Sequence, residues 1–338
     1  MRYKFSDLYY DDTKNAKKLK SSEYKNVGKY IIVDQGKSLI AGYTDDEDGL
    51  YADVPAIIFG DHTRNIKYID SPFFLGADGT KVLKSPLKNV NYKYLYYLLK
   101  NASIPDTGYN RHFKWLKELI FKCHSQEQQN RIVTILDKLD LTITKYREEL
   151  SLLDELVKAR FVEMFGEIED CDKWKSKIWN EVVTIQNGRD YKKVLVSDGG
   201  YPVVGTGGEI ARSSGYLCPE NTIVVGRKGS INNPMLMREK FWNVDTAFGV
   251  IPNSDYLHYQ YFYYFCKFYN FMKLNKATTL PSTTKADLLK IRINIPPLEL
   301  QNQFASFVEE IDKSRSRIQK SLEASQELFD SLMQEYFG

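Results

Sequence analysis

The sequence predicts an α+β fold in which two repeated mixed α/β modules are separated by two long helices that pair as an antiparallel coiled coil. Three observations predict it. The 338-residue chain repeats its plan once, each half ends in an uninterrupted heptad pattern, and short β-branched runs bounded by turn residues fill the remainder. The expected segments are a first module at 1–125, a helix at 126–165, a second module at 166–297 and a helix at 298–338.

The repeat is clearest at the end of each half. Residues 127–130 (EQQN) recur as 299–302 (ELQN), an offset of 172, and the alignment runs without a gap to a closing Phe-Gly pair in both halves. Residues 126–166 and 298–338 share 10 identities in 41 aligned positions, which chance explains poorly. Upstream the match is looser, as expected where loops differ in length.

Each repeated stretch is predicted to form one long helix. Apolar residues alternate at steps of four and three, the period of a coiled coil, and no proline or glycine interrupts 126–165 or 298–337. Each helix would span about 60 Å at ~1.5 Å per residue. Neither can bury its apolar stripe alone, so we expect the two to pair; a homodimeric coiled coil is the alternative. The expected pairing positions are Ile132, Leu136, Leu139, Ile143, Leu150, Leu153, Val308, Ile311, Ile318, Leu322, Phe329 and Leu332.

Charge is divided between modules and helices. The net charge is only +3, but residues 126–165 and 298–337 together hold 10 Lys and Arg against 16 Asp and Glu, whereas the rest holds 37 against 28. Basic modules joined by acidic, solvated connectors are typical of proteins that face a polyanion. Ordinary surface variation is the alternative interpretation.

Several functional classes lack their sequence signals. No apolar run approaches the ~18 residues of a membrane span, and the polar start lacks a signal-peptide core, so we expect a cytoplasmic protein. The four cysteines and four histidines show no metal-ligand spacing, so no metal site is expected. There is no Walker A motif, no glycine-rich cofactor loop and no Asn/Asp-Pro-Pro-aromatic motif. We therefore expect no catalytic residue and no cofactor in this chain.

Four segments in a fixed order carry a resemblance. They are YPVVGTGG at 201–208, IVVGRKGSI at 223–231, TTLPSTTKADL at 278–288 and IPPLELQNQF at 295–304. Together with the 172-residue repeat and the terminal Phe-Gly, this order resembles the specificity subunits of type I restriction-modification systems. The resemblance covers the entire chain, because residues 1–166 follow the same plan in weaker form.

The resemblance implies a DNA-recognition role without catalysis. It implies two target-recognition domains that each read half of a split, asymmetric site in double-stranded DNA. The helices would hold these domains apart and bind two modification (methyltransferase) subunits, with restriction (endonuclease/translocase) subunits completing the complex. The partner subunits would use S-adenosylmethionine, ATP and Mg²⁺. A self-sufficient DNA modification enzyme fragment and a coiled-coil scaffold that does not bind DNA are the alternatives.

Polar loops are the candidate DNA contacts. Arginine can pair with guanine and asparagine with adenine, while lysine and hydroxyl groups suit phosphates; a solvated polar surface is the alternative for each loop. The first module departs from the second, with GDHT at 60–63 where the second has GRKG at 226–229. The candidates are Arg227, Lys228, Ser230, Ser282, Thr283, Thr284 and Lys285 in the second module, and Tyr109, Asn110, Arg111, His112 and Lys114 in the first.

Overall fold

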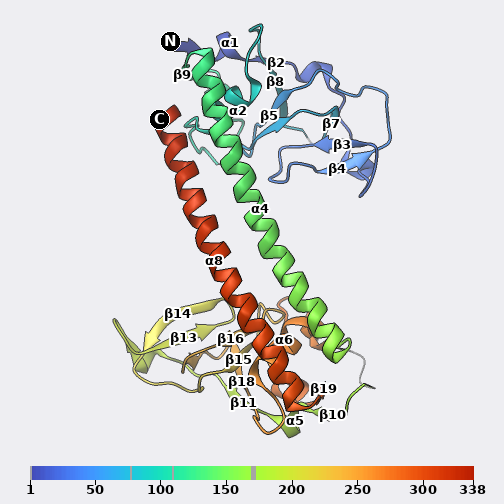
Figure 1. The fold of residues 1–338 in the computed structure, drawn as a ribbon, viewed down its shortest axis with the longest axis vertical. Coiled ribbons are helices and arrows are strands. Elements are labelled where there is room, and N and C mark those ends of the chain that lie inside the picture. Colours follow the sequence, from blue (N-terminus) through green and yellow to red (C-terminus); the bar gives the residue numbers. More distant parts are fainter. Residues whose placement is uncertain (1, 77, 109, 169–172) are drawn as a thin grey trace. The chain divides into compact units, whose positions relative to one another are not determined.

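The computed structural model describes residues 2–76, 78–108, 110–168 and 173–338. The chain divides into two compact units, one of Met1–Arg147 with Lys320–Gly338 and the other of Glu148–Gln319. The long helices α4 (Gln126–Phe165) and α8 (Leu298–Phe337) each contribute residues to both units (Figure 1). Each unit therefore combines one module with part of both helices.

The module of the first unit is built from short strands and three short helices. Its strands form sheets of order β2-β8-β5-β6, β4-β3-β7 and β1-β9, in which only β3 and β7 pair in parallel. The elements are β1 (Arg2–Lys4), α1 (Phe5–Leu8), β2 (Tyr10–Asp11), β3 (Tyr30–Val33), β4 (Gly42–Thr44), β5 (Ala56–Gly60), β6 (Ile66–Ile69), β7 (Phe73–Leu75), β8 (Thr80–Lys84), α2 (Tyr92–Lys100), α3 (Phe113–Leu116) and β9 (Ile120–Lys122), with 3-10 turns at Thr13–Asn15 and Ser21–Glu23.

The module of the second unit repeats this topology. Its sheets have the orders β11-β18-β15-β16, β12-β14-β13-β17 and β10-β19, and β13 and β17 are again the parallel pair. Strand β12 is the addition. The elements are β10 (Ser176–Ile178), α5 (Trp179–Val182), β11 (Val183–Asn187), β12 (Leu195–Val196), β13 (Tyr201–Gly205), β14 (Gly208–Ser213), β15 (Thr222–Gly226), β16 (Met235–Met237), β17 (Trp242–Asn243), β18 (Ala247–Pro252), α6 (Tyr259–Phe268), α7 (Lys285–Leu288) and β19 (Arg292–Asn294), with 3-10 turns at Lys192–Val194 and Phe271–Leu274.

The predicted pairing of the long helices is confirmed within each unit. In the first unit, Leu136 near the start of α4 shares a core with Phe329 near the end of α8. In the second, Phe161 and Phe165 near the end of α4 lie 5.5 and 5.4 Å, between ring centroids, from Phe304 near the start of α8. The helices are therefore antiparallel, and their apolar seam is covered within one chain rather than by a second copy.

The buried surface of each long helix is wider than its pairing seam. All twelve residues expected to pair are buried or half-buried, whereas most charged positions between them are exposed. Toward the modules the buried surface widens: Val133 and Phe161 of α4 and Met333 of α8 lie beside the heptad positions and are also buried. The helices therefore complete the module cores as well as pairing with each other.

The repeated glutamine of the EQQN and ELQN segments has a structural role. Gln301 is fully buried; its side chain accepts a hydrogen bond from the backbone N–H of His258 at 2.8 Å and donates to the carbonyl of Pro296 at 2.8 Å. Its counterpart Gln129 donates to the carbonyl of His124 at 3.0 Å. Because a buried amide must satisfy its donors and acceptors, Gln301 fixes the start of α8 against the preceding chain. Among the described residues, the half-buried Gln129 makes only the donor contact at the start of α4.

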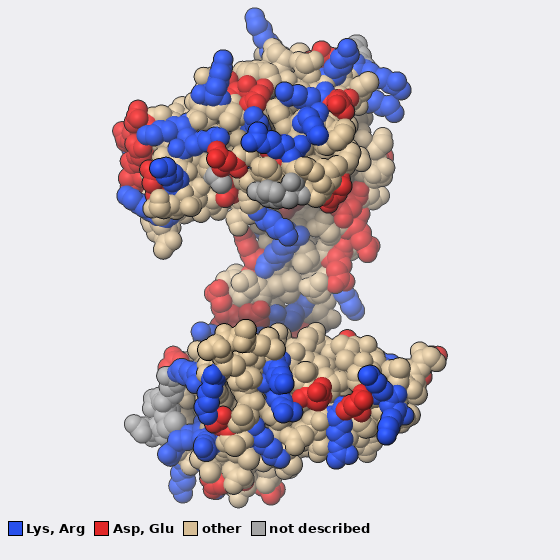
Figure 2. Space-filling model, turned by 180° about the vertical axis from the view of Figure 1, so that it is seen from behind, with Lys and Arg blue, Asp and Glu red and all other residues tan. Residues whose placement is uncertain are grey.

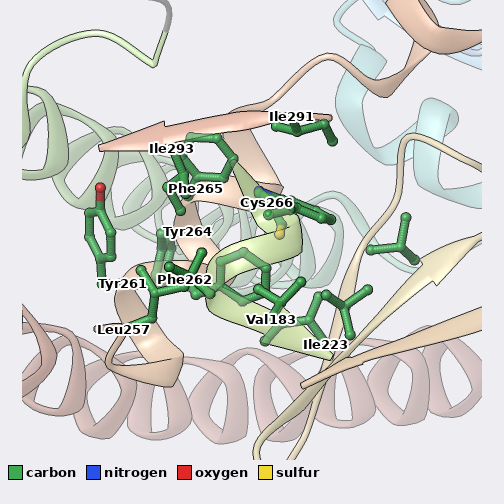
Figure 3. Packing of buried hydrophobic residues seen from close by; sticks show 14 of the residues in the cluster. Val183, Ile223, Leu257, Tyr261, Phe262, Tyr264, Phe265, Cys266, Ile291 and Ile293 are labelled. Carbon is green, nitrogen blue, oxygen red and sulfur yellow. The ribbon is translucent and has the colours of Figure 1, made fainter. Parts of the chain in front are cut away.

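The aromatic segments predicted as helices are α2 and α6, and α6 forms the centre of the second core. Figure 3 shows Phe262, Phe265 and Cys266 of α6 among Ile223 of the sheet and Ile293 of the short strand before α8. All five side chains are buried. Within the described ranges, no helix combines the length and apolar character needed to cross a membrane.

Truncation of Phe304 tests the contribution of the helix pair to the second core. Its ring is fully buried against Phe161, Phe165 and Tyr264, so Phe304→Ala should lower the free energy of unfolding by ~3–5 kcal/mol. Leu152→Ala on an exposed part of α4 is the control and should change it by less than ~0.5 kcal/mol. Urea unfolding followed by circular dichroism measures both; equal changes would contradict the packing described.

Candidate nucleic-acid interface

Two of the polar loops expected to contact DNA come together in the second module. Arg227 and Lys228 follow β15, and the residues 282–285 lead into α7; both line one pocket of about 510 Å³. Asn187 and Gly188, which end β11 and begin the next loop, line the same pocket. Loops distant in sequence thus form a single polar surface at one end of the β11-β18-β15-β16 sheet.

Backbone hydrogen bonds join these two loops. The N–H of Thr283 donates to the carbonyl of Arg227 at 3.0 Å, and the N–H of Gly229 donates to the carbonyl of Pro281 at 2.9 Å. Lys228 and Ser282 form an antiparallel bridge between them. Gly229 has a φ of +83°, which glycine adopts without strain. The loops therefore present their side chains from a fixed backbone.

Three of the candidates in the loop after β15 have exposed side chains that retain bonding capacity. Arg227 donates from its backbone N–H to the carbonyl of Thr246 and from one guanidinium N–H to the carbonyl of Asp245, at 2.8 and 3.3 Å. Its remaining guanidinium groups, and the side chains of Lys228 and Ser230, have no hydrogen-bond partner within the described residues. These donors can therefore meet a phosphate or the edge of a base.

The other candidates of this surface hold the loops in place. Thr283 is 3% exposed, and its hydroxyl donates to the carbonyl of Gly226 at 2.9 Å. Lys285 donates from its ammonium to the carbonyl of Ile185 at 2.8 Å. The half-buried Ser282 donates its backbone N–H to the side chain of Asn275 at 2.9 Å. The side-chain contacts of Thr283 and Lys285 are structural, which does not favour direct readout by these two side chains, whereas Ser282 is held through its backbone.

Thr284 caps the short helix α7. Its hydroxyl accepts a hydrogen bond from the N–H of Asp287 at 3.1 Å and donates to the carboxylate of the same residue at 2.8 Å. Hydrogen bonds from Lys276 and Thr284 lower the pKa of the Asp287 carboxyl below its usual value. The carboxylate is therefore charged at neutral pH, where it stabilises the start of α7.

The first module builds the same junction from different residues. The N–H of His112 donates to the carbonyl of Asp61, the residue after β5, at 2.8 Å, as Thr283 does to Arg227 after β15. The N–H of Phe113 donates to the Asp61 carboxylate at 2.7 Å, and the His112 ring is 1% exposed. His112 is thus part of the framework, a role that its polarity alone did not reveal.

The remaining first-module candidates differ in how their side chains are placed. Asn110, Arg111 and Lys114 are exposed. Asn110 donates its side-chain amide to the carbonyl of Thr107 at 2.6 Å, and the Lys114 ammonium lies 4.8 Å from the centroid of the adjacent Trp115 ring. Tyr109 lies outside the described residues.

The sequence reasoning missed a basic segment after β11. Arg189, Lys192 and Lys193 are exposed and follow Asn187 and Gly188 of the shared pocket. The signal was present, since an Asn-Gly-Arg triplet follows a β-branched run. Figure 2 shows groups of Lys and Arg on the viewed face of each module, interspersed with Asp and Glu.

Metal ligation has no support in this surface. Among the residues that the structure describes, no group of three or more His, Cys, Asp or Glu side chains could hold a metal ion. The surface is made of cationic, amide and hydroxyl groups, which suit a polyanion with hydrogen-bonding bases.

Comparisons with known proteins agree with this reading. The model of the family described as "Type I restriction modification DNA specificity domain" matches residues 6–152 and 171–326. The chain is 24% identical over 354 residues to the type I restriction enzyme EcoR124I/EcoR124II specificity subunit of Escherichia coli, covering 92% of this chain and 86% of that protein. A crystal structure of the type I restriction-modification system S subunit from M. genitalium matches with a TM-score of 0.69 at 17% identity, covering 100% of this chain and 96% of that chain. This last likeness shows the fold.

The buried hydroxyl of Thr283 provides a test of the loop junction. Thr283→Val keeps the shape but leaves the carbonyl of Gly226 without its donor, so the free energy of unfolding should fall by ~1–3 kcal/mol. Thr279→Val, at an exposed position of the same segment, is the control and should change it by less than ~0.5 kcal/mol. Chemical unfolding compares the two; a neutral Thr283→Val would show that this hydrogen bond does not secure the loops.

Proposed function

The chain belongs to the family of type I restriction modification DNA specificity domains. We propose that it is the DNA-reading subunit of a type I restriction-modification complex. Its target is a bipartite, asymmetric site in double-stranded DNA. The module at 1–125 reads one half and the module at 166–297 reads the other.

The observation that carries this proposal is that the two modules share one backbone framework but differ in the loop after the central strand. Both modules anchor the chain before a short helix to the residue that follows the central strand β5 or β15. That residue is Asp61, buried and bonded inward, in the first module and Arg227, exposed, in the second. Because sequence is read by side chains at base edges, an unchanged framework with different exposed groups suits two different half-sites.

The proposed division of labour leaves chemistry to the partners. Two modification subunits would supply methyl transfer with S-adenosylmethionine, and restriction subunits would supply ATP- and Mg²⁺-dependent cleavage. This chain would be non-catalytic and would act in the cytoplasm, where it positions both kinds of subunit on the recognised site. Methyl transfer to DNA by the isolated chain would instead support a self-sufficient modification enzyme.

The target itself tests the proposal. Methylome sequencing of cells with and without this chain should yield one motif of two unlike words separated by unread bases. In the assembled complex, Arg227→Ala should cost ~1–3 kcal/mol of discrimination at one position if the lost contact is a bidentate pair with guanine. Equal weakening on every duplex would place Arg227 on the phosphate backbone, and a single continuous word would contradict the two-module reading.

The helices carry a repeated exposed pair that suits two copies of one partner. Leu156 of α4 is 47% exposed, and Leu328 of α8, its counterpart at the 172 offset, is 49% exposed. The preceding Glu155 and Glu327 are also identical and exposed. Neither leucine supports a core, yet both persist in a segment where 31 of 41 aligned positions differ. We therefore propose that each leucine contacts one modification subunit.

A charged residue at either of these two positions should weaken the binding of one modification subunit. Leu156→Asp and Leu328→Asp should each lower the occupancy of one modification subunit, and the double variant should lose both, since burying an unpaired charge is costly. Leu152→Asp is the matched control, because Leu152 is 59% exposed on the same helix but aligns with Ala324. Native mass spectrometry gives the stoichiometry; full occupancy in the double variant would remove these leucines from the interface.

A further inference from the structure

The loop after β11 is clamped at its backbone while its side chains remain exposed. A Cβ on Gly188 would lie 1.8 Å from the carbonyl oxygen of Val244, so only glycine permits this approach. The N–H of Arg189 donates to the carbonyl of Asn243 at 3.0 Å, and the indole of Trp242 donates to the carbonyl of Arg189 at 3.0 Å. Both backbone polar groups of Arg189 are thus committed.

The other side of the clamp is fixed in the core. Asn243 is fully buried, and its side-chain amide donates to the carbonyls of Gln186 and Ala247 at 3.2 and 3.1 Å. Its side-chain oxygen accepts from the thiol of Cys218 at 3.3 Å. One asparagine thereby connects β17, the end of β11 and the start of β18, so the loop cannot shift without breaking a buried network.

Strand register brings this loop beside the Arg227 loop. Asn187 at the end of β11 pairs with Phe248 of β18, and Phe248 also pairs with Val225 near the end of β15. The strand ends lie two strand spacings apart, which is about 10 Å at ~4.8 Å per spacing. Since base pairs rise ~3.4 Å along DNA, that separation matches about three base pairs. Asn187 and Arg227 line the same pocket, so one DNA segment can meet both loops.

The exposed groups have the chemistry of base recognition. The side chains of Asn187 and Arg189 have no hydrogen-bond partner within the described residues. An asparagine amide matches adenine and a guanidinium matches guanine, each through two hydrogen bonds. A clamped backbone reduces the entropy lost when such contacts form. Lys192 and Lys193, exposed in the 3-10 turn that follows, are point charges suited to phosphates.

We propose that Asn187 and Arg189 are specificity-determining residues of the second module, with Arg189 reading a guanine at a position different from that read through Arg227, while Lys193 anchors the phosphate backbone. This inference rests on the proposed function, because it assigns side chains to the DNA site of that function. It differs from the sequence-based assignment, which contained neither Asn187 nor Arg189.

The experiment compares Arg189→Ala, Arg189→Lys and Lys193→Ala in the complex assembled with modification subunits. Binding is measured on the cognate duplex and on duplexes with each base pair of both words changed singly. Arg189→Ala should lose about 5- to 150-fold discrimination at one guanine and leave other positions unchanged. Arg189→Lys should not restore it, because an ammonium lacks the guanidinium fork. Lys193→Ala should weaken all duplexes alike and reduce the salt slope by about one.

The outcomes separate this inference from the proposed function. If the unaltered complex does not prefer its cognate duplex, the proposed function fails. If it does, but Arg189→Ala weakens all duplexes equally and Arg189→Lys restores binding, Arg189 contacts phosphate and the inference is overturned. Unchanged discrimination in Arg189→Ala overturns it as well. Asn187→Ala should reduce discrimination at one adenine of the target. Unchanged discrimination at every adenine would show that Asn187 does not read a base.

Discussion

The structure depends on the burial of two long amphipathic helices. A helix with a heptad stripe cannot leave that stripe in water, and here each stripe is covered by the other helix and, toward the modules, by a module core. Phe304 of α8 belongs to the same cluster as Phe161 of α4 and Phe262 of α6. The largest core of each unit therefore needs residues from one module and from both helices, and a framework fixed in this way can present variable loops without being rebuilt.

The repeated elements show which parts of the sequence could be predicted. The helix pair was accessible because the 3.5-residue period and the missing proline and glycine are local properties of the chain. The two modules were accessible because their central strands and aromatic helices repeat. That the helices complete the module cores was not predicted, because the positions that do so, such as Phe161 and Met333, lie beside the heptad seam and need the spatial arrangement to explain them.

In the polar loops, residue type alone does not predict whether a side chain is available to contact DNA. Arg227, Thr283 and His112 were all candidates for DNA contact, yet only Arg227 is exposed. A threonine hydroxyl or an imidazole can serve either a ligand or a nearby carbonyl, and the choice depends on the backbone that surrounds it. In both modules that backbone is the junction after the central strand, where backbone hydrogen bonds hold a loop that is distant in the sequence.

Exposure and repetition together separate two kinds of functional surface. An exposed residue that is the same in both halves, such as Leu156 and Leu328, suits a partner that is also present twice. Where the framework is equivalent but the exposed residue differs between the halves, that residue suits a ligand that also differs between them, such as two unlike DNA words. Arg227 belongs to the second kind, because the buried Asp61 takes its place in the first module. Arg189 lies beside Arg227 because β11 and β15 pair with the same strand. Motifs that match between the two halves of the chain mark the surfaces that both halves share. The residues that distinguish one half-site from the other differ between the halves, so matching motifs do not reveal them.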